Sequence, residues 1–217
     1  MVAARKEDST DGKFLKRVYH EAFKRTGKTF IYKYYPIKRG DNMLASGQVD
    51  GDLARISAFS EEQPDLIKVE ESVLTINISA FATDPKIRLK SYSDLYGKNY
   101  IVEYVFGSAW IDDELSPYMK NGTLIHVYHW SNGLKNLAAG RTDIFICIER
   151  TVLGGLLNGK INEIPVYIAG IMATESIHAF FHKKHKNLAV KISTALREMK
   201  QEGLIERYRH ESMVNLR

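Results

Sequence analysis

The chain has 217 residues, of which 44% are hydrophobic and 26% are charged, and this ordinary composition excludes a disordered or fibrous protein. Lys and Arg outnumber Asp and Glu by 31 to 26, but both signs are scattered, so nucleic-acid binding is not expected. The chain contains no apolar run long enough to span a membrane, about 18 residues. Its length fits one large domain or two lobes of about 100 residues each.

The first third of the chain alternates between strand and helix patterns. After "VAARKED", which fits the end of a strand, apolar residues at helical spacing predict a helix that Ser9, Thr10 or Asp11 can cap and that Gly27 ends. Aromatic and β-branched residues predict a strand over 29–36, and a short helix over 38–46 precedes a strand over 49–56. This order favours parallel strands with helices on the faces of the sheet.

The rest of the chain repeats this alternation after a long strand predicted over 73–83. The patterns predict strands over 99–107, 123–128, 142–149 and 164–172, and helices over 91–98, 108–122, 131–140, 151–160, 175–185, 187–203 and 204–217. The densest basic run, "KKHK" over 183–186, is interpreted as a solvated helix end. Cys147 lies in the apolar run "DIFICIE", which indicates a buried, inert thiol.

One short motif occurs twice. Leu-Ala-small-Gly-x-x-Asp ends at Asp50 and again at Asp143, 93 positions later. A single copy would be a generic turn from helix to strand, because glycine tolerates the left-handed backbone of a helix exit. Two copies, about one lobe apart, predict two similar halves.

A charged residue lies near the carboxyl end of each strand that follows the motif, Arg55 in the first and Glu149 in the second. Ligands of open α/β sheets bind at these strand ends. An arginine fork holds a carboxylate and a carboxylate holds an ammonium group, so the pair suits a zwitterion. The alternative is that both are solvated strand ends.

The stretches "YYPIKRGDNMLASGQVDGDLARI", "QPDLIKVEESV" and "LKNLAAGRTDIFI" together resemble bacterial extracytoplasmic solute-binding proteins of family 3, the amino-acid-binding type, in a divergent branch. The resemblance implies an α/β, two-lobed periplasmic-binding-protein-like (type II) fold with two crossing hinge strands. Lobe 1 would comprise 1–82 and 171–217, and lobe 2 would comprise 83–170.

The family also implies a function. The protein would be periplasmic, with no signal peptide evident in this sequence, and would capture an amino acid or similar small polar or carboxylate solute in an interlobe cleft. It would deliver the solute to the permease of an ABC transporter or to a sensor, with no cofactor, metal or catalysis.

Seven residues are the expected ligand contacts. Arg55 resembles the carboxylate clamp, although many members place that arginine later, in a Thr-rich loop that here reads "SAFSEEQ". Gly107 and Ser108 match a helix start whose amides receive an anion, and Glu149 lies close to the family's ammonium partner. Tyr35, Arg39 and Trp110 are expected to line the cleft, with structural roles as the alternative.

Two competing chemistries have weaker support. His178 and His182 lie four apart on a predicted helix, a spacing that suits metal ligands, but no third ligand follows and a structural role is favoured. Nucleophile and phosphate-loop motifs are missing. A clamp-fold enzyme of the periplasmic dehydratase type, with Glu149 as proton donor, remains the alternative function.

Overall fold

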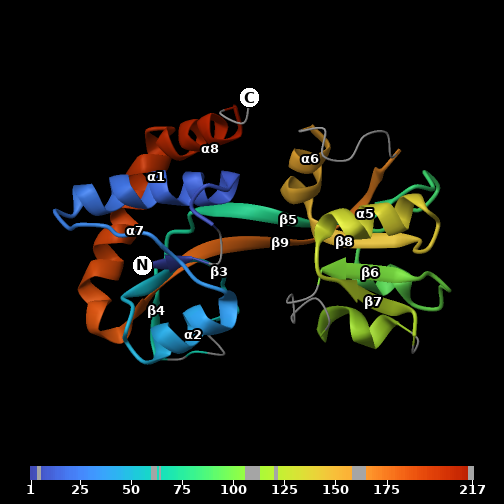
Figure 1. Ribbon diagram of the computed structural model, residues 1–217, viewed down its shortest axis with the longest axis horizontal. Helices are drawn as coiled ribbons and strands as arrows, with labels where there is room; N and C mark the ends of the chain where they lie inside the picture. The colour runs from blue at the N-terminus through green and yellow to red at the C-terminus, as the bar shows by residue number, and fades with distance from the viewer. Residues whose placement is uncertain are drawn as a thin grey trace. The chain divides into compact units, whose positions relative to one another are not determined.

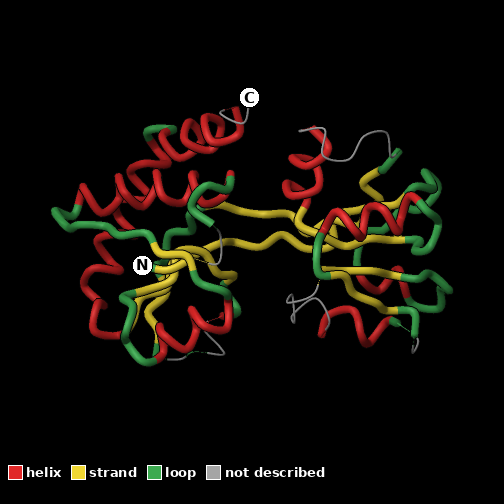
Figure 2. The backbone as a smooth tube through the Cα atoms, viewed as in Figure 1, coloured by secondary structure: helices red, strands yellow, loops and turns green. Residues whose placement is uncertain are grey.

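The computed structural model describes residues 1–3, 6–59, 63, 65–105, 113–119, 122–157 and 165–214 (Figures 1 and 2). The chain divides into two compact units. Unit 1 comprises Met1–Thr75 and Ser176–Arg217, and unit 2 comprises Ile76–Glu175. No described helix is long and apolar enough to cross a bilayer.

Unit 1 combines a mixed sheet with four helices among its described residues. Its strands are β1 (Val2–Ala3), β2 (Lys33–Tyr34), β3 (Gly51–Ile56), β4 (Leu66–Lys68) and the second half of β9 (Tyr167–His182). Its helices are α1 (Thr10–Arg25), α2 (Ile37–Ala45), α7 (Lys186–Gln201) and α8 (Leu204–Val214), with the short 3-10 turn η3 (Lys183–His185) before α7. β1 runs parallel to β2 and β3, as predicted, whereas β3 and β4 run antiparallel to β9.

Helix α1 forms where the apolar spacing predicts it. Ser9 is the N-cap, and its hydroxyl accepts a hydrogen bond from the Gly12 amide at 3.1 Å. The apolar positions are buried, and Gly27 follows the last turn with φ of 68°. The helix contacts α7 and α8, so the two ends of the chain share one core.

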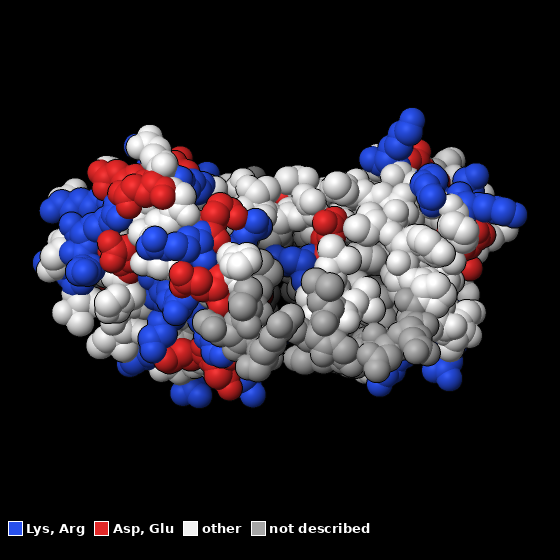
Figure 3. All heavy atoms as spheres, turned by 90° about the horizontal axis from the view of Figure 1, so that it is seen from above, with Lys and Arg blue, Asp and Glu red and all other residues white. Residues whose placement is uncertain are grey.

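The surface of unit 1 that carries α1 and α8 mixes both charge signs (Figure 3). Arg25 donates two hydrogen bonds to Glu202, at 2.7 and 2.6 Å, and Arg17 donates one to Glu211 at 2.5 Å. Solvent and salt screen these exposed pairs, so the buried apolar face of α1 holds the helices together more than the ion pairs do.

Unit 2 repeats the α/β arrangement. Its strands are β5 (Leu74–Ala82), β6 (Val102–Val105), β7 (Leu124–Val127), β8 (Ile144–Ile148) and the first half of β9. β6 is parallel to β7 and β8, as predicted, and β5 is antiparallel to β8. Helices α5 (Trp130–Ala138) and α6 (Glu149–Leu157) and the 3-10 turns η1 (Tyr92–Leu95) and η2 (Ser116–Tyr118) complete the described elements. Phe81, Leu134, Phe145 and Val152 join α5 and α6 to the sheet in one buried cluster.

The duplicated motif has the same geometry in both units. Gly47 follows α2 with φ of 69°, and Gly140 follows α5 with φ of 65°. In each copy the next residue donates a backbone hydrogen bond five residues back, from Gln48 to Met43 at 2.9 Å and from Arg141 to Asn136 at 3.0 Å. This pattern is the glycine exit that Schellman motifs use. The motif therefore marks one supersecondary unit that occurs in both halves of the chain.

Two predicted elements are wrong. Residues 175–182 belong to strand β9, not to a helix over 175–185. Phe180 and Phe181 are both fully buried, so both faces of this strand are covered, and an apolar run without alternation cannot be told from a helix. The strand predicted over 29–36 is reduced to β2, an edge strand of two residues with exposed side chains.

Strands β5 and β9 each belong to both units. The unit boundaries fall at 75/76 within β5 and at 175/176 within β9. The hydrogen-bonded strand order is β2-β1-β3-β9 in unit 1 and β5-β8-β6-β7 in unit 2. The lobe limits expected from the sequence, 82/83 and 170/171, lie at the end of β5 and within β9.

Candidate functional site

Arg55 owes its position to an irregularity in β3. Asp52 pairs with Phe180 and Arg55 with His178, so β3 has one more residue than β9 over this stretch. Such a bulge bends the strand and redirects its side chains. Asp52 stabilises the bulge through both oxygens of its carboxylate. Oδ1 accepts a hydrogen bond from the Ala54 amide at 3.0 Å, and Oδ2 accepts one from Arg55 Nε at 2.9 Å. The bulge thus brings an acid and an arginine three residues apart into contact.

The guanidinium of Arg55 is held from three sides. Besides Asp52, it forms an ion pair through Nη2 with Asp41 of α2. Its Cζ lies 4.7 Å from the centroid of the Phe59 ring, a cation–π contact. The Arg55 side chain is only 14% exposed and Asp52 is 2% exposed. Arg55 is therefore a rigid, oriented cation at the carboxyl end of β3.

Tyr35 and Arg39 are connected to the Arg55 contacts through Phe59, which belongs to the buried cluster that Tyr35 packs against. Tyr35 is half-buried and packs against the buried cluster that contains Phe59, Leu44 and Phe180. Arg39 is exposed, and its Cζ lies 5.2 Å from the centroid of the Tyr35 ring. Both residues are close in sequence to Asp41, so the segment around α2 contributes aromatic and charged groups to one part of unit 1.

Glu149 occupies the corresponding place in unit 2, directly after β8. Strand register pairs Ser79 of β5 with Cys147 of β8, and the buried Ser79 hydroxyl donates a 2.6 Å hydrogen bond to Glu149 Oε2. Glu149 is also the first residue of α6, where the helix dipole favours a negative charge. The carboxylate is thus half-buried and fixed at a strand end, as Arg55 is in unit 1.

The remaining three expected contacts are not located. Gly107, Ser108 and Trp110 lie in 106–112, outside the described residues. Sequence reasoning missed the residues that orient the two anchors, namely Asp41, Asp52, Phe59 and Ser79. An acid three residues before an arginine in a predicted strand, and a serine in the apolar run "ISAFA", were the available signals.

The two histidines expected on one helix face lie on a strand instead. His178 lies in β9, where its buried Nδ1 donates to the Val69 carbonyl oxygen at 2.8 Å, and His182 ends the strand and accepts from the Lys184 amide. The shared helix face expected for them is therefore wrong. Within the described ranges, no group of three or more His, Cys, Asp or Glu could hold a metal ion. Cys147 is buried, as predicted, and burial raises the pKa of its thiol to about 12.

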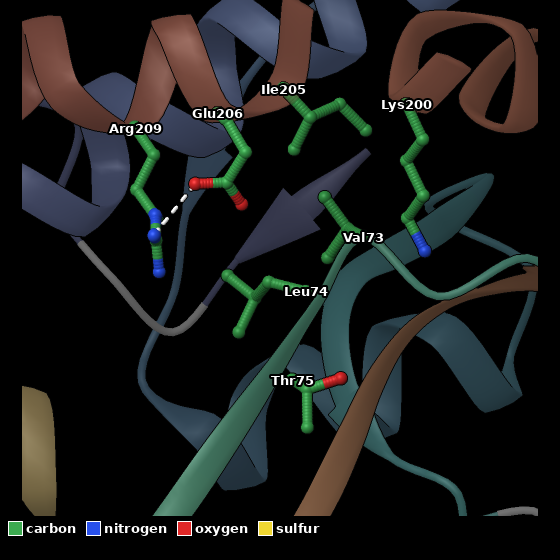
Figure 4. Close-up of a pocket in the computed structure, with 7 residues that line it drawn as sticks. All are labelled: Val73, Leu74, Thr75, Lys200, Ile205, Glu206 and Arg209. Atoms are coloured by element: carbon green, nitrogen blue, oxygen red, sulfur yellow. Dashed lines mark ion pairs between the residues drawn. The ribbon is translucent and has the colours of Figure 1, made fainter. Parts of the chain in front are cut away.

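A pocket of about 330 Å³ in unit 1 is lined by the start of β5 and by residues of α7 and α8 (Figure 4). Its charged lining residues have partners within the protein. Lys200 Nζ donates to Glu71 at 2.6 Å, and Arg209 pairs with Glu206 at 2.6 Å, the dashed contact in Figure 4. Among the described residues, none of the seven expected as ligand contacts lines this pocket.

No family model matches the chain. An uncharacterized protein of Shewanella oneidensis is 28% identical over 202 residues, which cover 92% of this chain and 76% of that protein.

Solved structures match almost the whole chain at low identity. AbpA from Streptococcus pneumoniae, an amino acid ABC transporter substrate-binding protein bound to L-arginine, is 15% identical, with a TM-score of 0.70 over 98% of this chain and 93% of that one. A mutant of ArgBP from T. maritima is 18% identical, with a TM-score of 0.67 over 93% and 85%. The GluR0 ligand-binding core in complex with L-glutamate is 10% identical, with a TM-score of 0.73 over 92% and 89%. The chain therefore has the two-lobed α/β fold of periplasmic binding proteins, as the resemblance implied.

Proposed function

We propose that this protein is an extracytoplasmic solute-binding protein that captures an amino acid or a similar small polar or carboxylate solute with residues of both units. The observation that carries the proposal is the fold, which the chain shares over more than nine-tenths of its length with structures that bind arginine and glutamate. We further propose a periplasmic location and delivery of the solute to a transporter permease or a sensor.

The two fixed charges support a zwitterionic ligand. Arg55 and Glu149 follow the same motif in their respective units, and each is held by buried neighbours. Arg55 would clamp the carboxylate and Glu149 would accept the ammonium group, with Tyr35 and Arg39 as lining. Gly107, Ser108 and Trp110 remain proposed contacts from the sequence. The alternative of a clamp-fold enzyme is not favoured, because the similar structures are binding proteins.

Asp41 gives this proposal a specific consequence. A carboxylate that binds the outer edge of a guanidinium uses Nη1 and Nη2, and Nη2 of Arg55 already pairs with Asp41. A ligand carboxylate would therefore share or displace Asp41. The Asp41 side chain is partly exposed, so such an exchange is sterically feasible.

Titration calorimetry with a panel of amino acids tests the proposal. Once a ligand is found, Asp41→Asn should raise its affinity several-fold, because a competitor for Arg55 is removed. Glu149→Gln keeps an acceptor for Ser79 but removes the charge, and we expect about tenfold weaker binding of a zwitterion. Glu206→Gln on α8 is the matched control and should bind as the unaltered protein does. Unchanged affinity in both Asp41→Asn and Glu149→Gln would contradict these roles.

A further inference from the structure

We infer that unit 1 carries a second binding site, a basic pocket for a phosphate-bearing anion, which goes beyond the proposed solute site. The pocket has a volume of about 520 Å³ and lies between the loop after α1 and the start of α7. Its lining includes three residues of the "KKHK" run, which the sequence presents as a solvated helix end.

Cations from separate segments line this pocket. Lys28 comes from the loop after α1, Lys184 from η3, and Lys186 and Lys191 from α7. In the part of the chain that the structure describes, Lys28, Lys186 and Lys191 form no ion pair, so their charges are available to a ligand. Convergence of unpaired ammonium groups on one cavity costs electrostatic energy unless an anion or solvent compensates it.

The single acid in the described lining, Asp50, does not cancel this charge. Asp50 Oδ1 lies 2.6 Å from His185 Nε2 and 3.5 Å from Lys184 Nζ, and the hydrogen bond from His185 holds the pKa of Asp50 below its usual range. The Lys184 ammonium also donates to the Gly47 carbonyl oxygen at 3.1 Å. Asp50 thus orients His185 and Lys184 at the pocket and is itself neutralised by them.

The amino end of α7 adds to the positive electrostatic potential of the pocket. The first three residues of this 16-residue helix line the pocket, and its N-cap, His185, makes no side-chain hydrogen bond to the first turn. Uncapped amides at a helix N-terminus favour an anion. The helix end and the lysines act on one cavity and favour the same sign of ligand.

The chemistry favours a phosphate over a single carboxylate. Three unpaired lysines exceed the charge that one carboxylate can neutralise, and the described lining contains lysines in place of the arginine forks that hold carboxylates bidentately. Lysine binds phosphate oxygens as a point charge. Phe30 and the 61% exposed Ile31 add an apolar wall, which fits either an organic phosphate or a phospholipid headgroup.

The pocket is distinct from the proposed solute site. Asp50 directly precedes β3, whereas Arg55 lies near the opposite end of that six-residue strand. At about 3.3 Å per residue the two ends are separated by more than about 10 Å. A ligand at one end therefore does not contact the anchor at the other.

Titration calorimetry with inorganic pyrophosphate at low ionic strength tests the site. We expect saturable 1:1 binding that weakens about tenfold or more in the double variant Lys186→Gln/Lys191→Gln and weakens with added salt. Both lysines are exposed, so the melting temperature should stay unchanged. The control Lys98→Gln/Lys135→Gln removes two exposed lysines from unit 2 and should bind as before.

Sedimentation with phosphatidylglycerol vesicles, against phosphatidylcholine vesicles, distinguishes the source of the phosphate. Pocket-dependent binding of pyrophosphate alone indicates a free phosphate-bearing solute, and pocket-dependent binding of the anionic vesicles indicates a lipid headgroup. Either result supports the site. If neither probe binds, or if both double variants lose binding equally, the inference is overturned.

Discussion

Glu103 is a buried carboxyl group with incomplete hydrogen bonding. It is 1% exposed in β6, where its Oε1 accepts from Asn136 Nδ2 at 2.9 Å and its Oε2 has no partner among the described residues. Burial raises the pKa of Glu103, and the Asn136 hydrogen bond offsets this only in part. A carboxyl group with a raised pKa in the folded state binds its proton more tightly there than in the unfolded chain.

This raised pKa predicts a pH dependence of stability. The contribution of Glu103 is fully present below its unfolded pKa and is lost as the pH rises through the folded pKa, so the free energy of unfolding should fall over that range. Glu103→Gln should remove this component, which amounts to about 1.4 kcal/mol when the folded and unfolded pKa values differ by one. Urea unfolding of both proteins from pH 4 to pH 8 measures it. Parallel curves would show that Glu103 does not titrate in this way.

Glu71 shows the opposite behaviour. Lys200 donates to its carboxylate at 2.6 Å, and this hydrogen bond is the main reason that the pKa of Glu71 is lowered. The stabilisation is present above the unfolded pKa and is lost as the pH falls through the folded pKa. Glu71→Gln should therefore cost about 1 kcal/mol at pH 7 and nothing at about pH 2. Glu206→Gln, an exposed pair on α8, should cost less than about 0.5 kcal/mol in the same unfolding experiment.

Arg55 illustrates what a residue-level pattern predicts and what it leaves open. The sequence places an arginine at a strand end, where the fold presents ligands, and the structure confirms that placement. The bulge and the contacts with Asp41 and Asp52 are tertiary, because they depend on pairing with β9. These contacts change the expectation for Arg55→Ala.

Arg55→Ala should lower stability as well as binding. Loss of the guanidinium leaves Asp52 buried without its cation, and we expect a loss of roughly 2–4 kcal/mol in the free energy of unfolding. An arginine that only clamps a ligand carboxylate would leave the melting temperature of the unliganded protein nearly unchanged. An unchanged melting temperature would show that Arg55 does not stabilise the bulge, and a calorimetric melting scan decides between the two results.

At the scale of elements, the duplicated helix exit requires a residue with positive φ at Gly47 and at Gly140, and substitution tests this requirement. Gly140 has a positive φ and open space where a Cβ would lie, so Gly140→Ala should cost about 1–2 kcal/mol through backbone strain alone. Gly47→Ala should cost more, because its Cβ would lie 3.2 Å from His182 Nε2. Gly154→Ala, within α6 and with open space, is the control and should be neutral or stabilising. Equal effects at all three positions, measured by urea unfolding, would contradict this account.

Elements with clear periodicity were predictable, and those shaped by neighbours were not. Helix α1 has its cap, apolar stripe and glycine exit in the sequence, and all three are confirmed. The last part of strand β9 is a continuous apolar run because both of its faces are covered, so periodicity carried no information there. Edge strand β2 pairs with Val2 and Ala3 of β1 among the described residues, and this pairing is a tertiary contact that the local sequence does not show.

At the scale of the whole molecule, the fold combines a duplicated motif with two strands that belong to both units. Each unit has its own buried cluster, and β5 and β9 belong to both. The chain is only 10–18% identical to structures of the same fold. This is consistent with a fold that depends on apolar cores of similar volume and pattern rather than on particular side chains. Amino acids are the ligands that the similar structures hold, which is why solute capture is the function proposed for this chain.

The most direct test is native mass spectrometry of the refolded protein after dialysis against a mixture of the common amino acids and small dicarboxylates. Solute binding predicts one added mass per chain, from an amino acid or a small carboxylate, that decreases in Glu149→Gln and remains in Glu206→Gln. A folded protein that retains no member of the mixture, at concentrations well above those at which binding proteins saturate, would contradict the proposed function.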